Sequence, residues 1–147
     1  MSFQRRWLLG LLAAAAATVV IPGCSSSTPK DSCGTAHQML DYNKSQTAAI
    51  GAKSDPEAGT QASTADYQQW ADRLKTYAGQ ISTPQPAAQH AQKAADLAGQ
   101  TVTLVQQARN ANSAPLEMQP PQWVQQYSDV QVQLNRELLA LKDACPA

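Results

Sequence analysis

Hydrophobic residues recur along the chain at spacings of three and four positions, which is the period of an α-helix and not of a strand. The clearest pattern lies between about residues 63 and 80, where Ser63 or Thr64 can cap the start of a helix. Its apolar positions fall on one helical face: Tyr67, Trp70, Ala71, Leu74, Tyr77, Ala78 and Ile81. The pattern predicts an amphipathic helix that buries this face.

Two longer helices are expected after it. One runs from about residue 86 to 109, and its alanine-rich line should allow another helix to approach closely. That line comprises Ala87, Ala91, Ala94, Ala98, Val102 and Val105. The other begins at Pro120-Pro121 and runs to about Ala144. Its stripe comprises Trp123, Tyr127, Val130, Leu134, Leu138, Leu141 and Cys145.

A fourth segment, residues 34–50, has the weakest pattern because Asn43 interrupts its apolar stripe, and Gly51 is expected to end it. The stripe comprises Ala36, Met39, Leu40, Thr47 and Ile50. The break that follows contains Asp55-Pro56, which can equally begin the next helix early. Four helices joined by short connections predict an all-α protein, folded as an up-down-up-down bundle.

Composition agrees with a helical protein and argues against a nucleic-acid partner. Alanine, the best helix former, and glutamine are abundant, and there is a single Phe. Charged residues make up 15% of the chain and balance to a net charge of zero. A nucleic-acid-binding surface normally needs a basic face, so we expect none here.

The first 24 residues have the pattern of an export signal. Arg5 and Arg6 precede an apolar run, residues 7–21, which is shorter than the ~20 residues of a membrane span. The run ends at Ile21-Pro22-Gly23-Cys24, and a Ser/Thr/Pro-rich stretch follows. An ordinary secretory signal with a chance cysteine is the alternative interpretation.

These residues resemble the lipobox of bacterial prolipoproteins, in which an aliphatic residue stands three positions before the cysteine and a small residue stands just before it. Ile21 and Gly23 occupy those positions, whereas Pro22 departs from the usual small residue. The resemblance implies cleavage between Gly23 and Cys24 and attachment of a diacylglyceryl group, with fatty acids such as palmitate, to the Cys24 sulfur through a thioether. It also implies a signal peptide at 1–23. The Ser/Thr/Pro-rich composition predicts a flexible tether at 24–32, and the helical periodicity predicts a bundle domain at 33–147.

Two weaker likenesses concern export and origin. Arg5-Arg6 followed by Trp7 is similar to a twin-arginine signal, although paired basic residues are common in every kind of signal peptide. The alanine-rich leader and the Gln/Ala-rich body resemble small lipoproteins of the mycobacterial envelope. The lipid anchor implied by the lipobox, and not these two likenesses, implies a place on the outer face of the cell membrane.

With Cys24 assigned to lipid, Cys33 and Cys145 remain. Export would place them in an oxidising compartment, where a disulfide is the default. An antiparallel bundle with an even number of helices also returns the chain to its starting end, so the two cysteines should meet there. A metal or redox pair is the rival interpretation, but the chain contains no CxxC.

Candidate functional residues are few. Tyr67, Trp70, Tyr77, Trp123 and Tyr127 either pack in the core or form the wall of an apolar pocket for a lipid or haem. His37 and His90 stand alone in their segments, and only Asp41 lies four residues after a histidine. We expect solvated histidines and no metal site.

The chain contains no GxSxG, GxGxxG or P-loop motif. We therefore expect no enzyme and no cofactor. The sequence favours a membrane-anchored extracytoplasmic lipoprotein that acts as a non-catalytic interaction or structural module of the cell envelope, with an unidentified envelope protein as its partner. The alternative is a carrier of an apolar ligand such as lipid or haem.

Overall fold

A computed structural model describes residues 31–55, 57, 59–111 and 122–146. The predicted signal peptide, Cys24 and the tether before residue 31 lie outside these residues, as does the whole connection 112–121. The described residues form four helices and no strand. The helices are α1 (Ser32–Ala52), α2 (Thr64–Ala78), α3 (Gln85–Ala111) and α4 (Gln122–Ala144).

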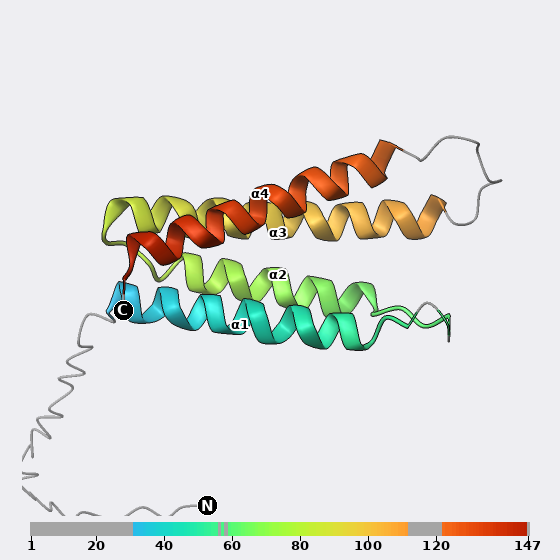
Figure 1. The fold of residues 1–147 in the computed structure, drawn as a ribbon, viewed down its shortest axis with the longest axis horizontal. Coiled ribbons are helices and arrows are strands. Elements are labelled where there is room, and N and C mark those ends of the chain that lie inside the picture. The colour runs from blue at the N-terminus through green and yellow to red at the C-terminus, as the bar shows by residue number, and fades with distance from the viewer. Residues whose placement is uncertain (1–30, 56, 58, 112–121, 147) are drawn as a thin grey trace, which may run out of the picture.

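The four helices form a bundle in which neighbours along the chain run in opposite directions, as the colours in Figure 1 show. The contacts between α3 and α4 are the most extensive, followed by those of α2 with α3 and of α1 with α2. Contacts between α1 and α4 are few. The expected all-α fold is therefore confirmed. Among helices that are neighbours around the bundle, the first and the last share the fewest contacts.

A disulfide joins these two helices at one end. Cys33, in the first turn of α1, is bonded to Cys145, which follows α4 directly, with an S–S distance of 2.07 Å. Cys145 is fully buried at the end of the α4 stripe. The hydroxyl of Ser32 accepts hydrogen bonds at this end from the backbone N–H groups of Ser82 and Thr83, in the α2–α3 connection. The predicted pairing of the two cysteines is confirmed.

The α1 helix differs most from its predicted form. It begins at Ser32 because the Asp31 side chain caps it, accepting a hydrogen bond from the Cys33 N–H at 3.1 Å. Asp31 and Ser32, the last two residues assigned to the tether, are thus the N-cap and the first residue of α1. The predicted end at Gly51 is wrong, since the helix continues to Ala52. Thr47, expected in the buried stripe, is exposed, and its hydroxyl donates to the Asn43 carbonyl instead.

The connection from α1 to α2 folds back on itself instead of starting α2 early. Asp55 and Thr60 exchange backbone hydrogen bonds of 3.0 Å, and Gly59 has a φ of 67°, a conformation that glycine adopts without strain. Helix α2 then begins with a capping box: the Ser63 hydroxyl accepts from the Asp66 N–H, and the Asp66 carboxylate accepts from the Ser63 N–H.

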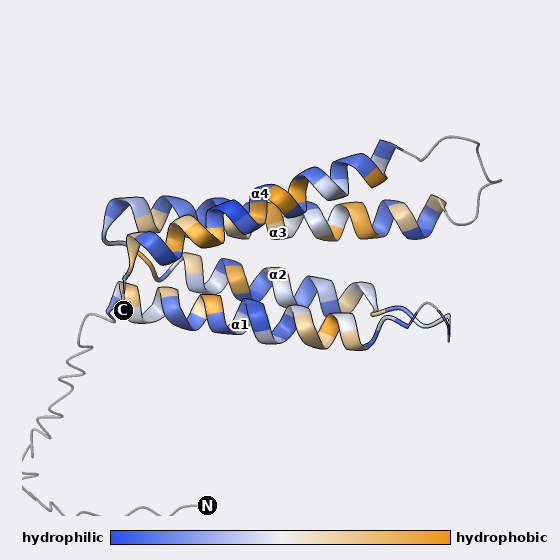
Figure 2. Ribbon diagram, in the orientation of Figure 1, coloured by the Kyte–Doolittle hydropathy of each residue, from blue (hydrophilic) through white to orange (hydrophobic). Residues whose placement is uncertain are grey.

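The core follows the predicted stripes. Four alanines in the first half of α3 are fully buried and face the other helices: Ala87, Ala91, Ala94 and Ala98. Each helix carries both hydrophobic and hydrophilic residues, which are interspersed along its length, as Figure 2 shows. Among the described helices, none combines the length and apolarity required to cross a membrane.

Candidate functional site: a half-open cavity at the end opposite the disulfide

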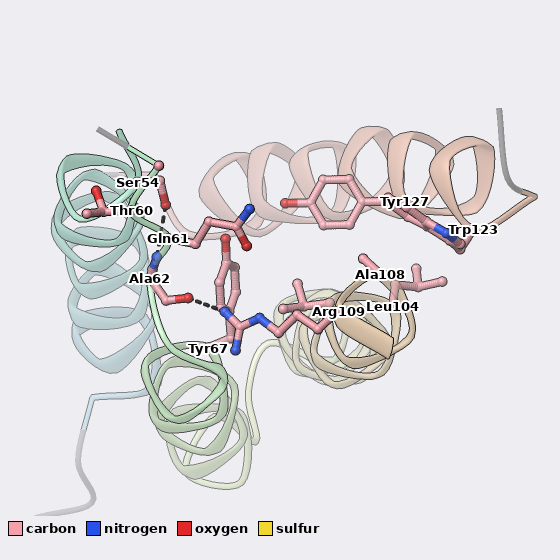
Figure 3. Close-up of a pocket in the computed structure, with 12 residues that line it drawn as sticks. Ser54, Thr60, Gln61, Ala62, Tyr67, Leu104, Ala108, Arg109, Trp123 and Tyr127 are labelled. Carbon is pink, nitrogen blue, oxygen red and sulfur yellow. Dashed lines mark hydrogen bonds between the residues drawn. The ribbon is translucent and has the colours of Figure 1, made fainter. Parts of the chain in front are cut away.

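A cavity of about 590 Å³, partly open to solvent, lies where the α1–α2 connection, the start of α2, the end of α3 and the start of α4 meet (Figure 3). This is the opposite end of the bundle from Cys33 and Cys145. Seven of its twelve described lining residues are apolar or aromatic: Ala62, Tyr67, Leu104, Val105, Ala108, Trp123 and Tyr127. Its volume lies within the range of roughly 300–1,000 Å³ that is usual for small-molecule sites.

The sizes of the side chains along α3 and α4 explain why the bundle is open here. Near the disulfide, α3 presents alanines, which let neighbouring helices approach closely. Toward the other end its inward positions are Leu104 and Val105, and α4 presents the rings of Trp123 and Tyr127. In Figure 1, α4 diverges from α1 and α2 toward this end. The large side chains at this end therefore keep the helices farther apart than the alanines do near the disulfide.

Arg109, in the last turn of α3, brings a positive charge to this cavity. Its guanidinium donates hydrogen bonds to the Ala62 carbonyl and the Thr64 hydroxyl, which ties the end of α3 to the start of α2. Among the described residues, no carboxylate lies within ion-pair distance of it and no Asp or Glu lines the cavity. The guanidinium has five N–H donors, so these two bonds leave others available.

Three more polar groups face the same space. The hydroxyls of Tyr67 and Tyr127 and the side-chain amide of Gln61 converge from α2, α4 and the α1–α2 connection (Figure 3). None of the three makes a hydrogen bond to another described residue. Buried or half-buried phenols usually find a hydrogen-bond partner, so their orientation into an open volume indicates room for one.

Burial raises the pKa of Tyr127 above its usual value, and the neighbouring phenol of Tyr67 adds to the shift. The Tyr127 phenol therefore keeps its proton throughout the neutral range and can donate a hydrogen bond. The indole N–H of Trp123 is also buried, with no partner among the described residues.

The five aromatic residues predicted as a possible pocket divide into two groups. Tyr67, Trp123 and Tyr127 line the cavity together. The other two lie elsewhere, because α2 packs between α1 and α3 and its apolar face is shared between them. Trp70 turns toward α1, where its indole N–H donates to the Asn43 amide oxygen at 3.0 Å.

Tyr77 also turns toward α1. Its ring centroid lies 5.8 Å from that of Tyr42, and the Arg73 guanidinium lies over it at 5.0 Å. Trp70 and Tyr77 thus pack α1 against α2 and do not line the cavity.

Sequence reasoning missed Arg109 and Gln61. A signal for Arg109 was present, because it stands four positions after Val105 and extends the buried stripe of α3 by one turn. A charged residue on such a stripe indicates a special environment. Gln61 comes from an irregular connection, where no periodic pattern can indicate the direction of a side chain.

The histidines have other surroundings. The His90 Nδ1 lies 2.7 Å from the Glu137 carboxylate, which joins α3 to α4, and the Lys93 ammonium lies 3.9 Å from the same carboxylate. His37 is half-buried on α1. Within the described ranges, no three His, Cys, Asp or Glu side chains are grouped so that they could hold a metal ion.

Comparison of the chain with models of known families, with curated proteins and with solved structures gave no match.

Proposed function

We propose that the protein is an exported lipoprotein, anchored by lipid on Cys24 to the outer face of the cell membrane, with a folded domain that binds and does not catalyse. The observation that carries this proposal is the Cys33–Cys145 bond. It occupies two of the three cysteines and leaves Cys24, three positions after the last residue of the apolar run, as the remaining thiol. A structural disulfide also favours an oxidising compartment.

The geometry is consistent with attachment from the N-terminal side. The domain begins at Asp31, seven residues after Cys24, and its first turn carries the disulfide. The tether therefore enters a covalently closed end of the bundle. A pull on the anchor would be transmitted through Cys33 to α4 as well as to α1.

An interaction surface is available on α4. The exposed large hydrophobic residues of the described chain are Val124, Val132 and Leu139, and all three belong to this helix. A partner protein of the envelope would bury them. The scarcity of charged residues also favours association through apolar and amide groups over ion pairs.

The anchor is tested by replacing one sulfur. In the producing cells, the wild-type chain should fractionate with membranes, and the mass of its N-terminal peptide should show acyl chains on Cys24. Cys24→Ala should be released or remain as an uncleaved precursor, whereas the matched control Ser25→Ala should behave as wild type. An unmodified Cys24 in the wild type, or unchanged processing and retention of Cys24→Ala, would refute lipidation.

The interaction surface is tested by site-specific photocrosslinking in intact cells. A photoreactive residue at position 139 on α4 should give a discrete adduct, and one at the exposed position 75 on α2 should not. Absence of any adduct from α4, together with turnover of a small substrate by the pure protein, would reject a non-catalytic module.

The cavity supports a second candidate, a carrier of an apolar ligand. Its volume and its aromatic wall are those of a binding site. A lipid-like molecule fits better than haem because no histidine lines the cavity, although two phenols do. Native mass spectrometry of the gently purified protein should find a bound small molecule. An empty protein that takes up no amphiphile would reject the carrier.

A further inference from the structure

We propose that the cavity takes an anionic amphiphile, a molecule with one apolar chain and an acidic head group, whose acid is held at Arg109, Tyr67 and Tyr127. This inference rests on the second candidate function, that of a carrier, and is independent of the anchor on Cys24. It adds the charge and the orientation of the ligand.

The sign of the charge follows from the residues around the opening. Arg109 is the charged side chain of the cavity wall, and the described residues place no carboxylate against it. A half-buried guanidinium beside apolar side chains gains most from an anion, since charge-assisted hydrogen bonds strengthen where water is partly excluded. A cationic ligand would meet repulsion from Arg109 and no opposite charge among the described residues that line the cavity.

The neighbouring polar groups suit the same head group. Phenolic O–H groups of Tyr67 and Tyr127 and the N–H₂ group of Gln61 are donors, and they lie on the side of the cavity where the Arg109 guanidinium lies (Figure 3). Because the Tyr127 phenol stays protonated, it donates and does not add negative charge. Carboxylate and phosphate oxygens accept several such bonds at once.

The apolar part of the ligand has its own wall. Leu104, Ala108 and Trp123 lie beyond Arg109, along α3 and α4 (Figure 3). A volume of about 590 Å³ accommodates one short or folded chain. The polar groups at one side and the apolar wall at the other fix the direction of the ligand: head toward the α1–α2 connection, chain toward the start of α4.

The test uses the full-length chain in zwitterionic phosphatidylcholine nanodiscs, which supply no free acid. Three photoreactive probes share one dodecyl chain and differ in head group: carboxylate, alcohol and trimethylammonium. The carboxylate should label residues 123–127, mapped by fragmentation of the tryptic peptide that contains them. This peptide is 110–136 in the wild type, 94–136 in Arg109→Gln and 110–142 in Arg136→Gln. The alcohol should label them more weakly, and the trimethylammonium compound least.

Two variants separate charge from shape. Arg109→Gln should weaken labelling by the carboxylate roughly tenfold or more, the usual effect of losing a charged hydrogen bond, and should weaken labelling by the alcohol by a clearly smaller factor. Arg136→Gln, on the exposed surface of α4, is the matched control. Because Arg109 also holds the start of α2, Tyr127→Phe provides a second variant that keeps the ring and should lower carboxylate labelling severalfold.

The outcomes distinguish this inference from the carrier function. Equal labelling by the carboxylate and the alcohol, insensitive to Arg109→Gln and Tyr127→Phe, would overturn the anionic head group and leave the carrier standing. Strongest labelling by the trimethylammonium probe would also overturn it. No labelling of residues 123–127 by any probe would overturn both proposals.

Discussion

At the scale of single residues, the pair formed by Trp70 and Asn43 shows how a polar interruption can belong to a core. Trp70 is 2% exposed, and its indole N–H needs an acceptor in an apolar environment. Asn43 supplies one from α1 at 3.0 Å. Asn43, which interrupts the apolar stripe of α1, is therefore the residue that accepts the hydrogen bond of the buried Trp70 indole on α2.

Asn43→Ala should leave that indole N–H without a partner. We expect a loss of about 1–3 kcal/mol in the free energy of unfolding, the usual cost of an unsatisfied buried donor. Asn43→Asp retains an acceptor oxygen at the same position and should stay much closer to wild type. Urea denaturation followed by circular dichroism measures both variants. Equal stability of Asn43→Ala and wild type would show that water replaces the amide at no cost.

Asp66 links stability to pH. Hydrogen bonds from the Lys53 ammonium, and then from the Ser63 hydroxyl and N–H, lower its pKa from 3.8 to about 2. A carboxyl whose pKa is lower in the folded state binds protons less readily there than in the unfolded chain. Its stabilising contribution is therefore complete above pH 3.8 and is lost as the pH falls toward about 2.

Asp66→Asn should remove this dependence. The unfolding temperature of the wild type should fall more steeply than that of Asp66→Asn between about pH 4 and pH 2, with the variant less stable at neutral pH. Asp72→Asn is the control, because the Asp72 carboxylate meets the neutral amide of Gln68 in the same helix. Parallel pH profiles of wild type and Asp66→Asn would contradict the assignment.

At the scale of elements, the spacing of apolar residues predicts all four described helices to within two residues at each end. The spacing does not show which residues of one apolar face contact which of the two neighbouring helices. The stripe of α2 contains both Tyr67 and Trp70, yet the first turns to the cavity and the second to α1. That division depends on which helices flank α2, which is a property of the packed bundle.

The candidate site is predictable only where it lies on regular helices. Trp123 and Tyr127 follow the α4 period and were expected on a buried face. Gln61 lies in a connection, so its direction depends on the turn closed by Asp55 and Thr60. The Asp31 cap was hidden by the linker-like composition of the residues before it, although aspartate favours that position.

Replacing Gly99 in α3 by alanine should stabilise the protein, whereas replacing Gly59 in the α1–α2 connection should destabilise it. Gly99 lies within α3 with nothing within 4 Å of the position that its Cβ would occupy. Gly99→Ala should stabilise the protein by about 0.5–1 kcal/mol because alanine has the higher helix propensity. Gly59 has a φ of 67°, so Gly59→Ala should destabilise it by about 1–2 kcal/mol despite open space around it. Thermal unfolding of both variants measures the contrast, and equal signs would refute it.

At the scale of the whole molecule, the bundle is fastened at one end and open at the other. The disulfide joins α1 to α4 where alanines of α3 allow close packing. At the other end Trp123 and Tyr127 stand beside the cavity, and Arg109 connects α3 to α2 without reaching α4. Because of this asymmetry, no covalent bond among the described residues fastens the start of α4 to α1, as the disulfide fastens its end.

Removing the disulfide should therefore lower stability and loosen a particular seam. Cys33 and Cys145 are separated by 112 residues, and in the chain-entropy model a bridge of that length contributes roughly 4–5 kcal/mol, an upper figure. We expect Cys33→Ala/Cys145→Ala to lose about 2–5 kcal/mol in the free energy of unfolding measured by urea denaturation, with a larger m-value because the unfolded chain expands.

Few other contacts join α1 to α4, so the same variant should show the largest acceleration of hydrogen exchange in the first turns of α1 and the last turns of α4. Wild type treated with reductant should reproduce both effects. Unchanged exchange at those turns would mean that the alanine-lined packing alone holds this end together.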